Sequence, residues 1–216
     1  MNITDCYLYV QDRLNKLSSN NSQNIQFPQF VRAFNTSQLQ WVEDRIKINE
    51  SSNLRTDEIS QLLTSVKLGT SIKDNYYEAG KPSDYFHFKR LYGTPCNVNI
   101  IPVREGDVNN LLKSSNWKPS LEWEETFATF VGDKIRIYKD ETFSLTGIYL
   151  VYFRYPIEVD IQGYTKYDST VSTNIDPEFQ GSSLVEILDM TCLLLASDIN
   201  DQLRYQAMTN KTTKHN

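Results

Sequence analysis

The hydrophobic and polar positions of this 216-residue chain follow a helical period at both ends. Near the N-terminus the apolar residues alternate in spacings of four and three, which is the pattern of one buried helix face. They are Ile3, Tyr7, Val10, Leu14 and Leu17. Similar reasoning predicts further helices over residues 28–46, with an interruption at Asn35, and over residues 56–69.

A long C-terminal helix is predicted over residues 183–208, where Ser183 and Glu186 have the spacing of a capping box. Asp189 and Asp198 lie inside its strongly apolar stretch, where an unpaired charge would be costly. Two interpretations stay open. Either this face of the helix touches water, or the helix contacts another subunit through a surface that is part apolar and part charged.

The middle of the chain changes to the period of two that marks half-buried strands. Strands are predicted over residues 85–91, 97–103, 126–131, 134–139 and 143–155. The pair Gly132-Asp133 suits a tight hairpin turn, and we expect Ile135 and Ile137 to be buried. Pro102 indicates an edge strand, because proline cannot donate to a ladder. The last three strands are predicted to form an antiparallel meander.

The remaining segments are predicted as connections with short regular pieces. Residues 71–83 and 163–181 have no clear period, and residues 157–161 resume the strand alternation. Asp107 is predicted to cap a short helix that begins at Val108.

The order of helices, then strands, then one returning helix indicates an α+β fold. We expect a discontinuous helical part, residues 1–80 and 181–216, packed with a β part, residues 81–180. The β part is expected to be an antiparallel meander or a small barrel. A chain of this length can form one domain or two small ones.

The charge balance bears on nucleic-acid binding. The chain carries 22 Lys and Arg against 27 Asp and Glu, a net charge of −5. This argues against a general nucleic-acid binder, because phosphate binding needs clustered Lys and Arg. A local stacking platform for single strands stays open as an alternative function. Its platform residues are Lys134, Arg136, Tyr138, Arg154 and Tyr155.

Few residues could carry chemistry. No phosphate-loop, dinucleotide-binding, zinc-protease or nucleophile-elbow motif occurs. Glu122, Glu124 and Glu125 surround Trp123 and could perform the acid–base work of a hydrolase, but a solvated rim explains them more simply. The cysteines have neither metal-ligand nor disulfide-framework spacing: Cys6, Cys96 and Cys192. We therefore expect no catalytic residues, no metal and no cofactor.

The sequence also predicts no membrane association. The longest apolar run, residues 192–196, is far too short to span a bilayer. The first residues have neither a basic start nor a long apolar run, so no signal peptide is predicted.

Five stretches, in order along the chain, carry a resemblance to a known family. They are Pro28-Gln29-Phe30 with Asn35, Pro82-Ser83-Asp84-Tyr85, PSLEWEET at residues 119–126, KIRIY at residues 134–138 and VYFRYP at residues 151–156. In these stretches the chain resembles the neck and tail ring proteins of short-tailed bacteriophages, above all the head-to-tail adaptor rings of crAss-like phages.

The resemblance implies a structural virion protein and no enzyme activity. Such proteins form rings, commonly of twelve copies, docked under the portal with their helices around the DNA channel. The expected partners are other copies of the chain, the portal protein, the next tail ring protein, and double-stranded DNA that passes without specific binding. The expected location is the neck or tail of the virion, after synthesis in the host cytoplasm. A tail ring that does not touch the portal is the alternative within this family.

Charged residues near the C-terminus are the predicted interface residues. They are Asp189, Asp198, Arg204, Lys211 and Lys214. The resemblance implies that C-terminal segments of such rings reach into the portal. The polar residues 209–216 cannot bury enough apolar surface to fold alone, so we expect a partner to order them.

Overall fold

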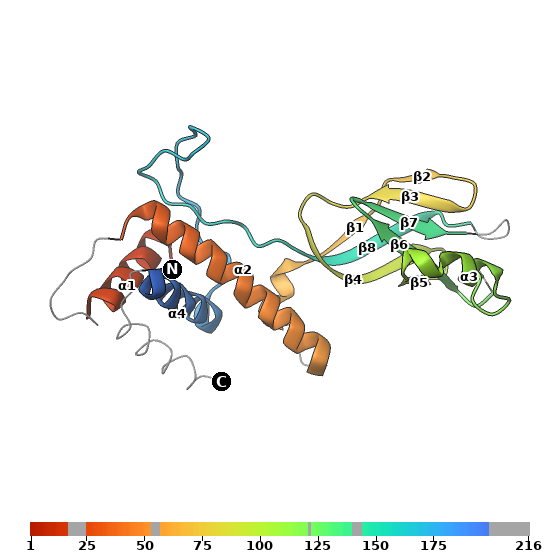
Figure 1. Cartoon of the computed structure of the whole chain (residues 1–216), viewed down its shortest axis with the longest axis horizontal. Helices are drawn as coiled ribbons and strands as arrows, with labels where there is room; N and C mark the ends of the chain where they lie inside the picture. Colours follow the sequence, from red (N-terminus) through yellow and green to blue (C-terminus); the bar gives the residue numbers. More distant parts are fainter. Residues whose placement is uncertain (17–24, 53–56, 121, 140–143, 199–216) are drawn as a thin grey trace. The chain divides into compact units, whose positions relative to one another are not determined.

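The computed structural model describes residues 1–16, 25–52, 57–120, 122–139 and 144–198. The chain divides into two compact units (Figure 1): a helical unit, Met1–Ser60 with Pro156–Asn216, and a sheet unit, Gln61–Tyr155. The fold class is α+β, as predicted. The sequence places the junctions after residues 80 and 180. In the structure, the segment up to residue 80 contributes strands to the sheet unit, and residues 156–180 belong with the helices.

Three α-helices form the described part of the helical unit: α1 (Ile3–Lys16), α2 (Phe27–Ser52) and α4 (Gly181–Asp198). Helix α4 packs against both α1 and α2, as Figure 1 shows. Its apolar side chains are therefore buried around much of its circumference, including Ile187 and Cys192. This double contact accounts for the wide apolar surface that the sequence of α4 displays. None of the described helices is both long and apolar enough to cross a membrane.

Two sequence predictions about these helices are wrong. Helix α2 continues through Asn35, whose amide bonds both backbone groups of Val159: Nδ2 donates to the carbonyl at 3.1 Å, and Oδ1 accepts from the N–H at 2.9 Å. The asparagine therefore holds a distant segment instead of capping a helix. Helix α4 begins at Gly181, so Ser183 lies within its first turn, and Glu186 accepts a 2.7 Å hydrogen bond from Trp41 Nε1. The predicted capping box is not formed.

Residues 156–180 run along the helical unit without forming a strand, which corrects the prediction for residues 157–161. Only isolated bridges occur there, Asp160 with Ile175 and Thr165 with Val171. Val159 and Ile161 are buried, as their alternation suggests, but no neighbouring strand pairs with them.

The buried carboxylate of Asp160 organises this segment. It accepts hydrogen bonds from the N–H groups of Ile161 at 2.9 Å and Thr173 at 3.2 Å, and from Tyr164 Oη at 2.8 Å. Lys166 Nζ lies 2.9 Å from Oδ2, the oxygen that also accepts from the Thr173 N–H. Side-chain hydrogen bonds of this kind replace the ladder that a strand would supply.

The sheet unit contains one eight-stranded sheet. In spatial order its strands are β1 (Leu63–Lys67), β8 (Gly147–Arg154), β4 (Tyr85–Thr94), β5 (Val98–Pro102), β6 (Glu125–Val131), β7 (Lys134–Tyr138), β3 (Tyr76–Gly80) and β2 (Thr70–Ile72). The β5–β6 pair is parallel and the other neighbouring pairs are antiparallel. Gly132 has a φ of 59° and makes the predicted hairpin turn between β6 and β7.

The connection between the two edge strands shows why this sheet curls. Strands β1 and β2 lie at opposite edges, yet only Leu68 and Gly69 separate them in the chain. Three residue steps, from Lys67 to Thr70, span at most about 11 Å. The two edges must therefore approach each other at this corner, and the sheet forms a curled half-barrel.

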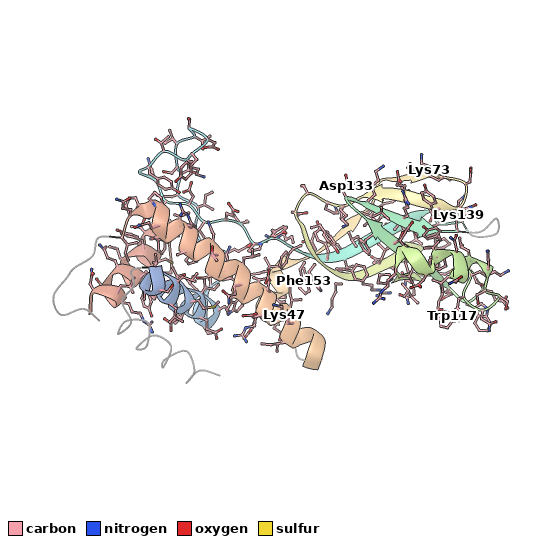
Figure 2. The ribbon with its side chains drawn as sticks, in the orientation of Figure 1. Lys47, Lys73, Trp117, Asp133, Lys139 and Phe153 are labelled. Atoms are coloured by element: carbon pink, nitrogen blue, oxygen red, sulfur yellow. The ribbon has the colours of Figure 1, made fainter. Side chains whose placement is uncertain are left out.

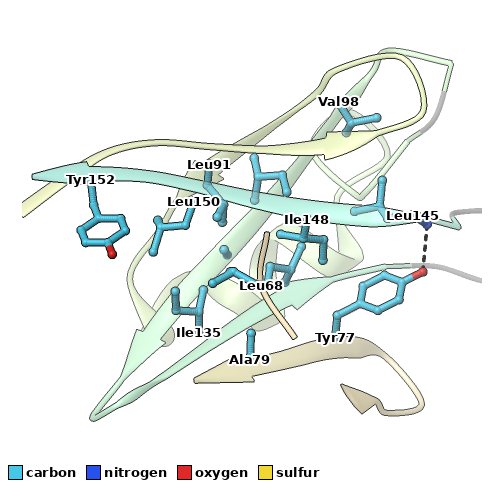
Figure 3. Packing of buried hydrophobic residues seen from close by; sticks show 13 residues of the cluster. Leu68, Tyr77, Ala79, Leu91, Val98, Ile135, Leu145, Ile148, Leu150 and Tyr152 are labelled. Atoms are coloured by element: carbon cyan, nitrogen blue, oxygen red, sulfur yellow. Dashed lines mark hydrogen bonds between the residues drawn. The ribbon is translucent and has the colours of Figure 1, made fainter. Parts of the chain in front are cut away.

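Aliphatic and aromatic side chains fill the concave side of the sheet (Figure 3). Ile135 and Ile137 on β7 have no exposed surface, which confirms the predicted register. On β8 the alternate residues Ile148, Leu150 and Tyr152 are buried. This interior is the core of the sheet unit.

The sequence misassigns the first three strands. Residues 56–69 were expected to form a helix, but a 3₁₀ helix (Asp57–Leu62) is followed directly by β1. Residues 71–83 were expected to be a loop, but they hold part of β2 and all of β3. These short strands gain their partners, β8 and β7, from much later in the chain, so tertiary pairing overrides the local pattern.

Two predictions about strand order are also wrong. The last three strands do not form a meander, because β8 lies between β1 and β4 and does not pair with β7. Strand β5 is internal and not an edge strand, although it contains Pro102. Pro102 is its last residue, and Val103 supplies the next donor, to the carbonyl of Ala128 at 2.8 Å. The proline thus ends the strand where its missing N–H breaks few ladder bonds.

Candidate interaction surface

An open groove of about 510 Å³ lies on the sheet unit. Its walls are the short helix α3 (Val108–Lys113), the loop after α3, and strands β5 and β6. We call it the Trp groove. Its lining residues are Ile101, Val103, Leu111, Ser115, Asn116, Trp117, Lys118, Ser120, Trp123, Glu125, Thr126 and Phe127. This volume lies within the usual range of ligand-binding pockets.

The floor of the Trp groove belongs to a second apolar cluster, separate from the sheet core. Val108 on α3 packs with Phe127 and Tyr138, whose rings stack at 5.1 Å between centroids. Asp107 precedes α3 as predicted, although its side chain makes no capping hydrogen bond. Ile101 on β5 remains 38% exposed beside this cluster. Helix α3 therefore covers only part of this apolar area.

Two tryptophans with high exposure line the groove. Trp117 is 64% exposed and Trp123 is 75% exposed. Figure 2 shows Trp117 at the margin of the sheet unit, away from the sheet core. The third tryptophan, Trp41 in the helical unit, is only 4% exposed. A large aromatic surface left in water is unusual for a tryptophan and is typical of a binding surface.

Backbone hydrogen bonds hold the loops that carry these tryptophans. The Lys118 N–H donates to the carbonyl of Ser114 at 3.2 Å, which forms a tight turn after α3. Ser120 and Glu125 exchange two backbone hydrogen bonds, at 3.0 and 3.1 Å, and enclose the Trp123 turn. Asn99 on β5 donates to the carbonyl of Glu124 at 2.8 Å, which ties that turn to the sheet. Both tryptophans are thus presented on loops with fixed ends.

The rim of the groove is acidic. Residues 117–125 contain one basic residue, Lys118, and three acidic ones, Glu122, Glu124 and Glu125, a net charge of −2. All three glutamates are exposed. This confirms the predicted solvated rim and places no carboxylate in the desolvated setting that a general acid needs.

Asp189, predicted as an interface residue, is occupied within its own chain. Arg13 on α1 forms an ion pair with it, and Arg13 Nη2 donates to Asp189 Oδ2 at 3.1 Å. The two side chains are only 18% and 13% exposed. The pair gives the carboxylate a partner inside the helical unit, which is the compensation that a charge in an apolar stretch requires.

The other predicted interface residues cannot be placed in a site. Asp198 is the last described residue of α4, and the predicted continuation of this helix to residue 208 lies outside the described residues. Arg204, Lys211 and Lys214 lie outside the described residues. Their assignment to an interface stays a prediction.

The platform residues of the nucleic-acid alternative do not share one surface. Three of them lie on β7, Arg154 is the last residue of β8 and Tyr155 follows it, and β7 and β8 are not neighbours. Tyr138 is buried. Lys134 donates to Glu78 at 2.9 Å, and Arg136 lies 3.7 Å from the same carboxylate. The hydrogen bond between them lowers the pKa of Glu78 and raises the pKa of Lys134.

The charge of the chain is divided unequally between its two units. The sheet unit has 12 Lys and Arg against 11 Asp and Glu, a net charge of +1. The helical unit has 10 against 16, a net charge of −6. The acidic character of the chain therefore resides in its helices and the segment that accompanies them.

Comparisons with known proteins give no assignment. No protein-family model matches the chain, and a search of curated proteins finds no match. Among the described residues, no group of three or more His, Cys, Asp or Glu side chains could hold a metal ion.

Sequence reasoning missed the Trp groove because its parts have no common period. Trp117 and Trp123 fall in a stretch of Lys, Pro, Ser and Glu, which looks like an ordinary connection. A usable signal was present, however. A tryptophan in a polar, proline-containing stretch has no helix or strand face on which to be buried, and two within seven residues should direct attention to the surface.

Proposed function

We propose that this protein is a structural subunit of an oligomeric ring in the neck of a short-tailed bacteriophage. The ring connects the portal to the tail and lines the DNA channel. Its partners are other copies of the chain, twelve in a ring, together with the portal protein and the next tail ring protein. It resides in the virion after synthesis in the host cytoplasm. The family resemblance of the sequence motivates this proposal.

The pair of exposed tryptophans at the Trp groove is the structural observation that best supports the proposed ring. Two such side chains offer roughly 200–350 Å² of aromatic surface per copy. Stable interfaces bury at least about 1,000 Å², so the tryptophans supply a hot spot within a larger contact and not the whole of it. A chain that exposes an aromatic groove with a polar rim is suited to assembly.

The acidic helical unit supports the second part of the proposal. With a net charge of −6, its surface repels phosphates and releases no counterions from DNA. Such a surface lets a double helix pass without being held. A nucleic-acid-binding module would need the opposite, a cluster of unpaired cations.

The test is assembly on the portal. Wild-type protein is mixed with purified portal, sedimented and imaged by negative stain, alongside the double variant Trp117→Ala/Trp123→Ala. We expect rings on the portal for wild type and at least a tenfold loss of assembly for the double variant. Ile72→Ala is the matched control, because Ile72 is 70% exposed on β2 of the same unit and does not line the groove. Unchanged assembly of the double variant would remove the tryptophans from the interface.

The two alternatives predict different outcomes of the same experiment. Rings that form without binding portal would indicate a ring lower in the tail. Submicromolar, salt-sensitive binding of the purified protein to DNA would favour the nucleic-acid-binding module instead.

A further inference from the structure

We infer that the Trp groove of each copy receives the C-terminal segment, residues 199–216, of a neighbouring copy. This inference rests on the proposed ring, because it needs a neighbour that supplies the segment. The proposed contact lies between two subunits, with the groove on one copy and the C-terminal segment on the other.

The first argument is charge complementarity. The groove loop, residues 117–125, has a net charge of −2, with its three glutamates exposed. Residues 199–216 contain Arg204, Lys211 and Lys214 against a single acidic residue, Asp201, a net charge of +2. The segment is thus basic in a chain that is acidic overall, and the groove has the matching sign. Opposite charges of this kind steer association and fix its register.

The second argument is the fit between the apolar parts. The segment carries Leu203, Tyr205 and Met208 between its polar residues. The groove offers the exposed faces of Trp117 and Trp123 around an aromatic floor. Aromatic rings pair favourably in offset or edge-to-face arrangements, and a methionine thioether also contacts aromatic rings well. One tyrosine with one or two aliphatic neighbours suits a groove of about 510 Å³.

The segment is long enough to reach a neighbouring subunit. Eighteen residues follow Asp198, the last described residue of α4, and an extended chain of that length spans up to about 60 Å. Tyr205 is seven residues beyond Asp198 and could reach about 25 Å. An arm of this length can cross from one subunit to the next while its basic end meets the acidic rim.

The geometry of such a contact favours a closed assembly. Each copy gives one segment and receives another, so donor and acceptor surfaces differ and the contact is heterologous. Heterologous contacts generate rings when the rotation closes. Each single contact can be weak, because linked contacts around a ring raise the effective concentration of every segment.

The direct test uses a synthetic peptide of residues 199–216 and the truncated chain 1–198, once a melting curve shows that 1–198 unfolds cooperatively like the full-length chain. Tryptophan fluorescence reports binding, since Trp117 and Trp123 are exposed while Trp41 is buried. We expect a saturable blue shift on addition of the peptide. Trp123→Ala in the chain, or Tyr205→Ala in the peptide, should weaken binding at least about tenfold, as for interface hot spots. Glu122→Lys should weaken it several-fold at low salt, and Ile72→Ala should leave it unchanged.

A complementation experiment tests whether the segment comes from a neighbour. The donor is the full-length chain with Trp117→Ala and Trp123→Ala, and the acceptor is the truncated chain 1–198. Each alone should sediment as a monomer, and the mixture should form a 1:1 complex. Monomers in the mixture would overturn the neighbour contact. A donor–acceptor complex alongside a wild-type full-length chain that stays monomeric at the same concentrations would mean that each chain fills its own groove, and would overturn it too.

The remaining outcomes separate this inference from the ring itself. No binding of the peptide to 1–198, or binding that ignores the tryptophan variants, overturns the inference even if full-length rings form on the portal. A peptide that binds purified portal but not 1–198 overturns it in favour of the portal as the destination. Peptide binding and donor–acceptor complexes without any ring on the portal would support the contact and contradict the proposed function.

Discussion

The helical unit and the sheet unit hold themselves together in different ways. The described helical unit buries polar side chains among its apolar ones: Ser37, Gln38, Asp160, Ser172 and Thr191. Ion pairs connect its helices, Arg13 with Asp189 and Arg45 with Glu186. In the described sheet unit the buried polar side chains are Thr126 and Thr129, both on β6, besides the hydroxyl groups of the buried tyrosines Tyr77, Tyr138 and Tyr152.

This difference determines which surfaces each unit leaves available for partners. Directional polar contacts fix the helices and the segment of residues 156–180 in one arrangement, so this unit depends on individual residues and on pH. The sheet unit is stabilised mainly by burying apolar side chains on the concave side of its curled sheet. This hydrophobic stabilisation does not depend on the direction of individual contacts. The outer side of the sheet keeps an aromatic surface that α3 only partly covers. We therefore expect core substitutions to damage the sheet unit and groove substitutions to damage only assembly.

The largest effect is expected from Ile137→Ala in the sheet core. Ile137 has no exposed surface, so truncation leaves a cavity and lowers the free energy of unfolding by about 2–4 kcal/mol. Urea unfolding measures this, with Ile72→Ala as the control. Because Ile72 is 70% exposed, its loss should change the free energy by less than about 0.5 kcal/mol. A loss that small for Ile137→Ala would contradict the register of β7.

The next largest effect is expected from Asp160→Ala in the helical unit. The substitution removes the acceptor for two backbone N–H groups and one tyrosine hydroxyl, and should cost about 2–3 kcal/mol. Alkylation of Cys6 and Cys192 reports the opening of this unit, because burial raises their thiol pKa values to about 11 and about 12. Their alkylation should become faster in Asp160→Ala. An unchanged rate would mean that residues 156–180 are held by other contacts.

The same carboxylate predicts an acid dependence. Burial alone would raise the pKa of Asp160, but hydrogen bonds from Lys166, Tyr164 and two backbone N–H groups outweigh it and lower the pKa below its ordinary value of 3.8. A lowered folded-state pKa adds stability that is present above the ordinary value and lost as pH falls below it. The thermal midpoint of the wild type should therefore fall as the pH drops below about 4. Asp160→Asn should lack this part of the acid dependence.

A smaller effect is expected from Asp189→Ala. Loss of the ion pair leaves Arg13 without this carboxylate in a mostly buried position, which should cost about 1–2 kcal/mol in the isolated chain. If Asp189 acted mainly through another subunit, the isolated chain would be unchanged and only assembly would weaken. Urea unfolding at low protein concentration distinguishes the two roles.

The smallest effect on stability is expected from Trp123→Ala. Trp123 is 75% exposed, so its removal should change the free energy of unfolding by less than about 0.5 kcal/mol, although truncating a buried tryptophan costs several times more. Thermal unfolding is a sufficient measurement. A clear loss of stability would mean that the Trp123 turn is part of the sheet core.

The sequence predicts the periodic elements well and the order of the sheet poorly. The alternation around Ile135 and Ile137 places β7 and its buried face correctly, because one apolar face must be covered. Strand β1 is missed because Ile59, Leu62 and Val66 also fit a helical spacing. The position of β8 between β1 and β4 depends on pairing over long sequence distances, which no local pattern contains.

The candidate surface was harder to predict for a related reason. The Trp groove forms only when α3 covers part of β6 and when Ser120 pairs with Glu125, so its walls come from three separate segments. Asp189 could be recognised as a charge that needed a partner, but its partner, Arg13, lies 176 residues away. Such a partner becomes visible only in the folded helical unit.

If this chain is the proposed ring subunit, it must assemble on the portal. The most direct measurement is the native mass of the complex formed when purified full-length protein is mixed with purified portal. We expect one complex in which a closed ring of twelve copies of this protein is bound to the portal. A protein that remains monomeric, with the portal mass unchanged at micromolar concentrations of both, would contradict it.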